Sequence, residues 1–218
     1  MLSYLFTNPL LIVAYLVALL LAITIHEFSH AYVADRLGDP TPHLQGRLSL
    51  NPRVHLDPMG LIFLFIFGFG WGKPVQFDPF NLKDPRRDAA LISFAGPLSN
   101  FIVAVILAIG LRLFLLFDLG ILETIGSFFL LPMISLNVML GIFNLIPIHP
   151  LDGFKIVGGL LPKGKSHEWY ELERYGMIFL LMLIFPFGRN SLLEMLIGPV
   201  IRLALSLLIP QTSSTGIL

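Results

Sequence analysis

The chain has 218 residues, of which 56% are hydrophobic and only 13% are charged, and its 14 basic residues balance its 14 acidic ones. Soluble domains carry about 25% charged residues, so this composition indicates a protein built for lipid. Zero net charge argues against nucleic acid as a partner. Because there is no cysteine, a metal site would have to use histidine and carboxylate ligands.

The first apolar stretch runs from Pro9 to about Leu37. It is long enough to cross a bilayer as a helix, which takes about 20 residues. Pro9 suits a helix start, and Gly38-Asp39-Pro40 suits a stop. No basic residue precedes the stretch and no small-residue cleavage site follows it, so we expect a retained helix rather than a signal peptide.

The second apolar stretch, MGLIFLFIFGFGWG at 59–72, is short. As a helix it would reach roughly 21 Å, less than the ~30 Å of the hydrocarbon core. Its phenylalanines and its glycines at 68, 70 and 72 favour extended backbone. We therefore expect a short re-entrant segment resembling a β-hairpin near 59–78, whose free edge could pair with an extended substrate.

Four further apolar segments follow, at about 89–117, 124–146, 177–187 and 192–209. The first two are long enough to cross a membrane, whereas the last two could form two crossings or a hairpin. The sequence thus predicts an all-α integral membrane protein, a polytopic helical bundle with about five to six membrane segments. We expect one domain over 1–218, with a catalytic core at about 9–160 and C-terminal helical segments at about 166–210.

The loop charges predict which ends of the helices meet. Basic residues gather in 36–57, 73–88 and 153–174, whereas 1–8 and 118–123 contain none. Loops rich in Lys and Arg stay on the cytoplasmic side of a membrane. The helix that carries HEFSH and the segment that precedes Asp152 would then both end at the cytoplasmic face.

HEFSH, at 26–30, has the spacing of half a zinc site. His26 and His30 are four residues apart, so both imidazoles can bind one ion from the same face of a helix. Glu27 projects to the side, where it can accept a proton from a metal-bound water, as in the H-E-x-x-H pattern. A catalytic zinc needs a third protein ligand. Asp152 is the natural candidate, with Gly153 relaxing the backbone after it.

Ionisable groups inside an apolar helix support this interpretation, because each costs at least about 2.5–3.5 kcal/mol to place in the bilayer and is functional by default. A structural role for the histidines in helix packing would leave both the glutamate and the spacing unexplained.

Three motifs resemble those of the site-2 proteases, which are intramembrane zinc metalloproteases. They are HEFSH, AGPLSN at 95–100 and NLIPIHPLDG at 144–153. The loops GRLSLNPRVHLDPMG and GKPVQFDPFNLKDPRRD are also similar to those of the compact bacterial and archaeal type, which lacks PDZ and CBS domains. The resemblance covers about 9–160. It implies one zinc ion per chain, bound by His26, His30 and Asp152, with Glu27 as the general base.

The resemblance also implies roles for residues outside the metal site. Asn144 would orient the aspartate or the substrate, and Asn100 would contact the substrate near the scissile bond. His149 stands where the family more often has proline, and it could donate a hydrogen bond to Asp152 or to the developing oxyanion. The other histidines, His43, His55 and His167, fall in loops, where we expect them to be solvated.

The sequence therefore predicts an intramembrane zinc metalloprotease in a prokaryotic cell membrane, with its active site toward the cytoplasm. Its partners would be the lipid bilayer and a membrane-protein substrate with a transmembrane helix. The identity of the substrate and the formation of homo-oligomers stay open. Three alternatives also stay open: a membrane zinc transporter, a metal-free scaffold, and a zincin of the prenyl-protein endopeptidase type, whose third ligand would be a glutamate such as Glu168 or Glu171.

Overall fold

The structure is a computed structural model that describes residues 9–67, 70–117, 121–185 and 191–210. Helices form most of it, as predicted, and the described residues contain no sheet. Leu56 and Gly72 make an isolated antiparallel bridge. The all-α prediction is therefore confirmed.

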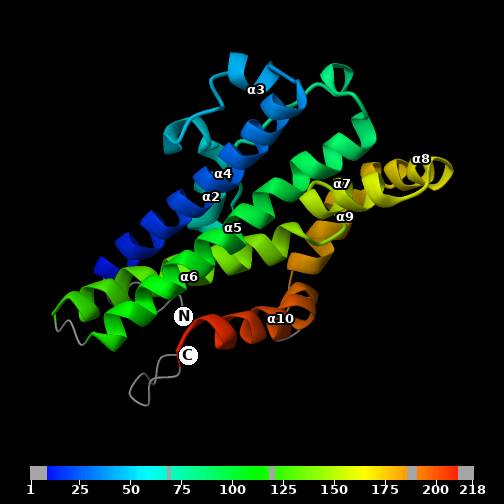
Figure 1. Ribbon diagram of the computed structural model, residues 1–218. Coiled ribbons are helices and arrows are strands. Elements are labelled where there is room, and N and C mark those ends of the chain that lie inside the picture. Colours follow the sequence, from blue (N-terminus) through cyan, green and yellow to red (C-terminus); the bar gives the residue numbers. More distant parts are fainter. Residues whose placement is uncertain (1–8, 68–69, 118–120, 186–190, 211–218) are drawn as a thin grey trace.

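Three long helices pack side by side and form the body of the molecule, α2 (Pro9–Leu37), α5 (Pro85–Leu116) and α6 (Ile121–Asn144) (Figure 1). Each contains a segment long and apolar enough to cross a membrane, which in α6 is Thr124–Asn144. All three segments coincide with predicted spans. Because α5 runs back against α2 and α6 runs back against α5, the end of α2, the start of α5 and the end of α6 all point toward the same end of the bundle.

Small residues allow these helices to approach closely. Ala14, Ala18 and Ala22 recur every fourth residue along α2 and are fully buried. Ala104 of α5 is also fully buried, in a cluster with Val138 of α6. Such contacts are typical of helix packing in lipid, where small residues let backbones come together.

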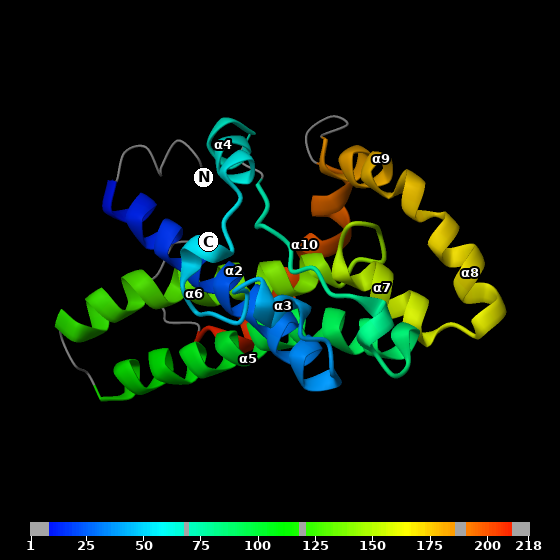
Figure 2. The ribbon, with the colours of Figure 1, turned by 90° about the horizontal axis from the view of Figure 1, so that it is seen from above.

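Shorter elements surround the bundle. They are α3 (Thr41–Leu44), η1 (Pro52–Val54), α4 (Pro58–Phe67), η2 (Pro79–Asn81), α7 (Asp152–Leu160), α8 (Lys163–Glu171), α9 (Glu173–Ile184) and α10 (Leu192–Leu208). In Figures 1 and 2, α7 and α8 extend from the end of the bundle that lies farthest from the α5–α6 connection.

The predicted hairpin near 59–78 is wrong over its first half, because Pro58–Phe67 is the helix α4. Asp57 begins this helix: its side chain accepts hydrogen bonds from the backbone N–H groups of Met59 and Gly60. An aspartate followed by proline is a strong helix start, and this local signal outweighs the β propensity of the phenylalanines. Of the glycines that favoured a strand, Gly68 lies outside the described residues.

The two C-terminal segments do not confirm the predicted five to six crossings. α9 has 12 residues and α10 has 17, so they reach roughly 18 and 25 Å. Both lengths fall short of the hydrocarbon core. The end of the segment predicted at 177–187 lies outside the described residues, and three candidate spans remain.

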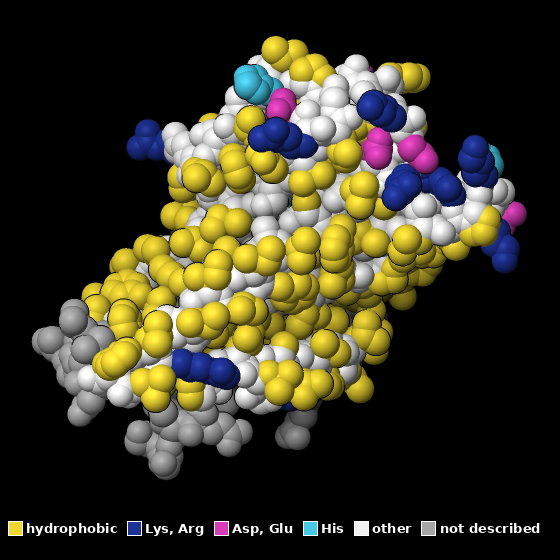
Figure 3. Space-filling model, viewed as in Figure 1, with side chains coloured by type: hydrophobic (Ala, Val, Ile, Leu, Met, Phe, Trp, Pro, Cys, Tyr) yellow, Lys and Arg dark blue, Asp and Glu magenta, His cyan; other side chains and the backbone are white. Residues whose placement is uncertain are grey.

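The surface of the bundle suits a lipid environment. Figure 3 shows hydrophobic side chains covering the long helices, with most of the charged side chains gathered near α3 and α8. On α5, Ile102, Ile106 and Ile109 are each more than half exposed. Water-exposed helices place polar residues at such positions, so this face is one that lipid would cover.

Asp39 ties together two loops at the charged end of the bundle. Its fully buried carboxylate accepts hydrogen bonds from the N–H and hydroxyl of Thr41, the N–H of Asp78 and the amide of Asn81. Burial raises the pKa of Asp39, but these hydrogen bonds outweigh burial and hold the pKa below its ordinary value of 3.8. The ionised carboxylate therefore stabilises the fold.

We expect Asp39→Ala to lower the Tm of the detergent-solubilised protein at pH 7 by about 3–8 °C, because it leaves several buried donors without an acceptor. A carboxylate with a lowered pKa stabilises above its unfolded pKa and loses this effect as the pH falls below it. The difference in Tm should therefore shrink at pH 3. Asp35→Asn is the control, since the Asp35 carboxylate is partly exposed and, among the described residues, its ion-pair partner is His43, at 3.6 Å. Equal effects of the two substitutions would contradict the role of Asp39.

Candidate metal centre

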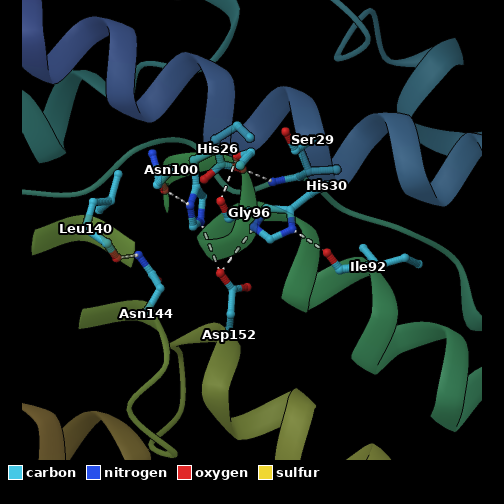
Figure 4. Close-up of polar contacts among 12 residues, drawn as sticks. His26, Ser29, His30, Ile92, Gly96, Asn100, Leu140, Asn144 and Asp152 are labelled. Atoms are coloured by element: carbon cyan, nitrogen blue, oxygen red, sulfur yellow. Dashed lines mark hydrogen bonds and ion pairs between the residues drawn. The ribbon is translucent and has the colours of Figure 1, made fainter. Parts of the chain in front are cut away.

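Three predicted residues meet at the junction of α2 and α7. Nε2 of His26 lies 3.0 Å from Oδ2 of Asp152, and Nε2 of His30 lies 3.2 Å from the same oxygen. The three side chains point toward one another in Figure 4. Among the described residues, this is the group of histidines and acids that could hold a metal ion. Glu168 and Glu171 on α8 do not belong to it.

The local sequence explains how Asp152 reaches α2. α6 ends at Asn144, and α7 begins at Asp152 after a turn that contains Pro147 and Pro150. Gly153 lies in α7, so it does not relax a turn as expected. A Cβ on Gly153 would come within 2.3 Å of the Leu145 carbonyl oxygen, so glycine allows α7 to pack against the end of α6.

The hydrogen bond to the other ring nitrogen fixes the tautomer of the neutral His30 ring. Its Nδ1 lies 2.7 Å from the carbonyl oxygen of Ile92 on α5. A carbonyl oxygen can only accept, so Nδ1 carries the proton. In the neutral imidazole, Nε2 then presents a lone pair toward Asp152.

A chain of buried amides fixes His26 in the same way. Nδ1 of His26 lies 2.7 Å from Oδ1 of Asn100. The Nδ2 of Asn100 donates to the Ala22 carbonyl at 3.1 Å and to Oδ1 of Asn137 at 2.9 Å. Asn137 in turn donates to the Met133 carbonyl at 2.8 Å. Because a backbone carbonyl can only accept, the NH₂ groups of Asn100 and Asn137 must face the two carbonyls. The Oδ1 of Asn100 then faces His26 and accepts, so Nδ1 of His26 must be the donor.

The donor set fits a divalent metal ion. Two imidazole lone pairs and a carboxylate oxygen face one point, and Oδ2 of Asp152 is buried with no hydrogen-bond donor. Three acceptors that share no proton repel one another unless a cation lies between them. Two histidines and one carboxylate are a ligand set of catalytic zinc sites, and their outer nitrogens donate to oxygen as zinc-binding histidines do.

Glycine also lets α5 approach the two histidines. A Cβ on Gly96 would lie 2.5 Å from Cε1 and Nε2 of the His30 ring and 2.6 Å from Cε1 of His26. Real Cβ contacts are essentially never closer than 3.0 Å. The absence of a side chain at this position therefore leaves room for both imidazoles.

Glu27 lies beside the ligands and faces a cavity of about 100 Å³, which His26, His30 and Asp152 also line. Its Oε2 accepts a hydrogen bond from the N–H of Val75 at 3.0 Å. The carboxylate is thus held by backbone and is not among the three converging ligands.

Arg47 holds the segment that positions Glu27. Its guanidinium is almost fully buried and donates to the carbonyl oxygens of Val54, Lys73 and Pro74. The N–H of Lys73 donates to the His55 carbonyl. We expected the predicted hairpin near 59–78 to offer a free edge to a substrate strand. The contacts of Arg47 and His55 occupy much of the backbone of residues 73–75, so this segment mainly holds Glu27.

Asn144 and Asn100 lie in different environments. Asn144 lines the cavity, and its Nδ2 donates to the Leu140 carbonyl (Figure 4). Asn100 is fully buried and its amide already bonds His26, Ala22 and Asn137, so it does not face the cavity as a substrate contact would.

The remaining histidines lie away from the metal centre. His149 packs against Phe154, and its Nδ1 is 3.6 Å from Glu173, so the structure does not bring it to Asp152. His43 and His167 are largely exposed, as expected, but they lie in the helices α3 and α8 rather than in loops. His55 differs from its prediction: it is fully buried, its Nε2 donates to the Ser49 carbonyl, and burial lowers its pKa.

Asn137 is the residue that our sequence reasoning missed. It lies in the middle of an apolar helix, where a polar side chain is expensive. It also precedes Asn144 by seven residues, two helical turns, so both occupy a similar face of α6. These two signals together would have identified it.

The chain is similar to known proteins over most of its length. The model of Peptidase family M50 matches residues 14–127 and 120–184. A Bacillus subtilis protein named "Putative zinc metalloprotease YwhC" is 41% identical over 196 residues, which cover 86% of this chain and 88% of the relative. Rip2 of Mycobacterium tuberculosis, which carries the same designation, is 32% identical over 170 residues, 75% of this chain and 63% of Rip2. No solved structure gives a significant match.

We expect Gly96→Ala to weaken metal binding at least tenfold, because the added methyl group would displace both imidazoles. The absorption spectrum of bound Co²⁺, which reports ligand geometry, should change as well. Gly110→Ala is the matched control on the same helix, since a Cβ there meets nothing within 4 Å. Native Co²⁺ spectra and affinities in both variants would show that Gly96 does not matter for the site.

We expect Asn137→Leu to weaken zinc binding about tenfold, because it removes the acceptor that orients Asn100. Asn137→Asp keeps an acceptor and should retain most of the affinity, measured by competition with a chelator. Val138→Ala controls for general loss of packing next to the same site. If the Leu and Asp variants bind zinc equally well, the amide chain does not orient His26.

Proposed function

Because the chain belongs to peptidase family M50, the site-2 protease family, we propose that it is a zinc metalloprotease that cleaves membrane-protein substrates within or next to a transmembrane segment. The observation that carries this proposal is the convergence of His26, His30 and Asp152 beside Glu27, in a molecule built on three helices of membrane-spanning length. The helices support a membrane substrate because the site lies between them rather than in a separate soluble domain.

The proposed roles follow from the contacts. His26, His30 and Asp152 would hold one zinc ion, which would supply a Lewis acid that acidifies water and polarises the peptide carbonyl. Glu27 would accept the proton of the attacking water and return it to the leaving amine. The N–H of Val75 holds one oxygen of Glu27, so the carboxylate stays oriented through both transfers.

Local unwinding of the substrate is part of this proposal. In a helix the backbone groups are hydrogen-bonded within the helix, and the cavity beside Glu27 holds about 100 Å³. An intact helix is about 10 Å wide and cannot enter such a space. The substrate would therefore reach Glu27 as an extended segment. Asn144, which lines the cavity, is placed to contact this segment.

A position in a prokaryotic cell membrane, with the centre toward the cytoplasm, is also proposed. The support is the distribution of charge: Arg36, Arg47, Lys73 and Lys155 all belong to loops or helix ends near the metal centre. Relatives in bacteria support a prokaryotic setting.

The alternatives have less support. A transporter needs ligands at successive depths in the membrane, whereas the candidate ligands in the described part of the chain form a single group at one end of the bundle. The prenyl-protein endopeptidase type would need Glu168 or Glu171 near the histidines, and neither joins them.

We expect Glu27→Gln to reduce cleavage at least a hundredfold while the purified protein keeps its zinc, because the base is lost but no ligand is. The measurement compares zinc content and the membrane proteomes of cells that express wild type or variant, in which uncut single-span proteins should accumulate. Glu168→Gln on α8 is the control. Loss of zinc in that control would favour the prenyl-type site, and identical proteomes for wild type and Glu27→Gln would oppose the protease function.

A further inference from the structure

A second, larger cavity adjoins the metal centre. It has a volume of about 330 Å³ and lies between η2, the start of α5 and helices α7 and α8. Phe77 and Lys155 line both this cavity and the one that contains Glu27. The two spaces therefore share a wall, with the Nζ of Lys155 resting 4.9 Å from the centroid of the Phe77 ring.

The walls of the second cavity are apolar with a cationic rim. Pro79, Pro85 and Ala89 provide apolar surface beside Phe77. The charged residues that line the cavity, Lys155 and Arg86, are both basic. Neither makes an ion pair with any described residue, and Arg86 donates to the Leu161 carbonyl. Two half-buried cations without a carboxylate partner favour an acidic ligand.

We propose that this cavity is a substrate subsite that receives an apolar side chain together with a neighbouring aspartate or glutamate of the substrate. The inference rests on the proposed protease function and adds a sequence preference to it. The apolar walls would bury the apolar side chain, and Lys155 and Arg86 would pair with the carboxylate.

Distances along the chain place this preference relative to the scissile bond. Lys155 follows Asp152 by three residues, about 4.5 Å along the axis of α7. An extended peptide advances about 3.3–3.6 Å per residue. The subsite should therefore read a residue about one or two positions from the bond that is cut.

The test uses the zinc-loaded full chain in detergent and a set of synthetic peptides with one fixed apolar core. Each peptide carries Asp, Asn or Lys at a single position, which is varied across the core. Mass spectrometry gives the cleavage rate, and fluorescence anisotropy gives the affinity. Wild type should prefer Asp over Lys roughly fivefold at a position about one or two residues from the cut.

Charge reversal makes the test specific. Lys155→Glu combined with Arg86→Glu should reverse the preference, so that Lys is favoured at the same position, while zinc content stays unchanged. Lys163→Glu on α8 is the matched control, since Lys163 is exposed and lines neither cavity. It should leave the preference as in wild type.

Two failures remain distinguishable. If peptides are cut or bound without any charge preference, or if reversal leaves the preference unchanged, the subsite is overturned and the protease function stands. If the zinc-loaded wild type cuts no peptide and no membrane protein, the proposed function itself fails. A binding preference that reverses with Lys155 and Arg86 would still support the subsite as a peptide site in that case.

Discussion

With both imidazoles neutral, the inner nitrogens of His26 and His30 and the carboxylate of Asp152 are acceptor atoms that face one another, and this is the constraint on which the site depends. The outer nitrogens of His26 and His30 are committed as donors, which leaves their inner lone pairs directed at Asp152. Such an arrangement is unfavourable in an apolar bundle unless positive charge balances it. The surrounding structure can be understood as the support that keeps this unfavourable geometry in place.

That support comes from packing and from hydrogen bonds at different depths of the bundle. Gly96 and Gly153 bring backbones close enough for ligands from two distant parts of the chain to converge. Farther into the bundle, Asn100 and Asn137 orient one imidazole through bonds that end on backbone carbonyls. In the loop that precedes η2, Arg47 binds the backbone of residues 73–74, and the next residue, Val75, holds Glu27. The hydrogen-bond chains end on backbone groups, which cannot change their protonation and so cannot alter the state of the ring.

Much of the site could be predicted from the sequence, because the features that indicate it are either the spacing of residues within one helix or the distribution of charge among the loops. The spacing of His26 and His30 and the distribution of basic loops were enough to place Asp152 beside them, and the structure confirms that meeting. Three long apolar helices were equally clear from length and composition. The helix α4 could not be predicted in this way, because the composition of its segment favours a strand and the helix depends on the single N-terminal cap at Asp57.

The partners of the site were harder to predict because they depend on tertiary contacts. Nothing in the sequence near Asn100 indicates that its amide is fully used inside the bundle, and His149 is near Asp152 in sequence but faces α9. Buried His55 likewise depends on how a loop folds over Glu27. A motif specifies residue types and spacing, whereas the direction of a side chain is set by neighbours that the motif does not contain.

The ligands come from α2, near the start of the chain, and from α7, beyond the long bundle. A bound ion would therefore also act as a cross-link that joins α2 to α7. Ligand binding to the native state stabilises it in proportion to the logarithm of free ligand concentration. The cellular supply of metal would then govern how long the folded protein survives as well as whether it is active, so that zinc scarcity would remove the enzyme by degradation.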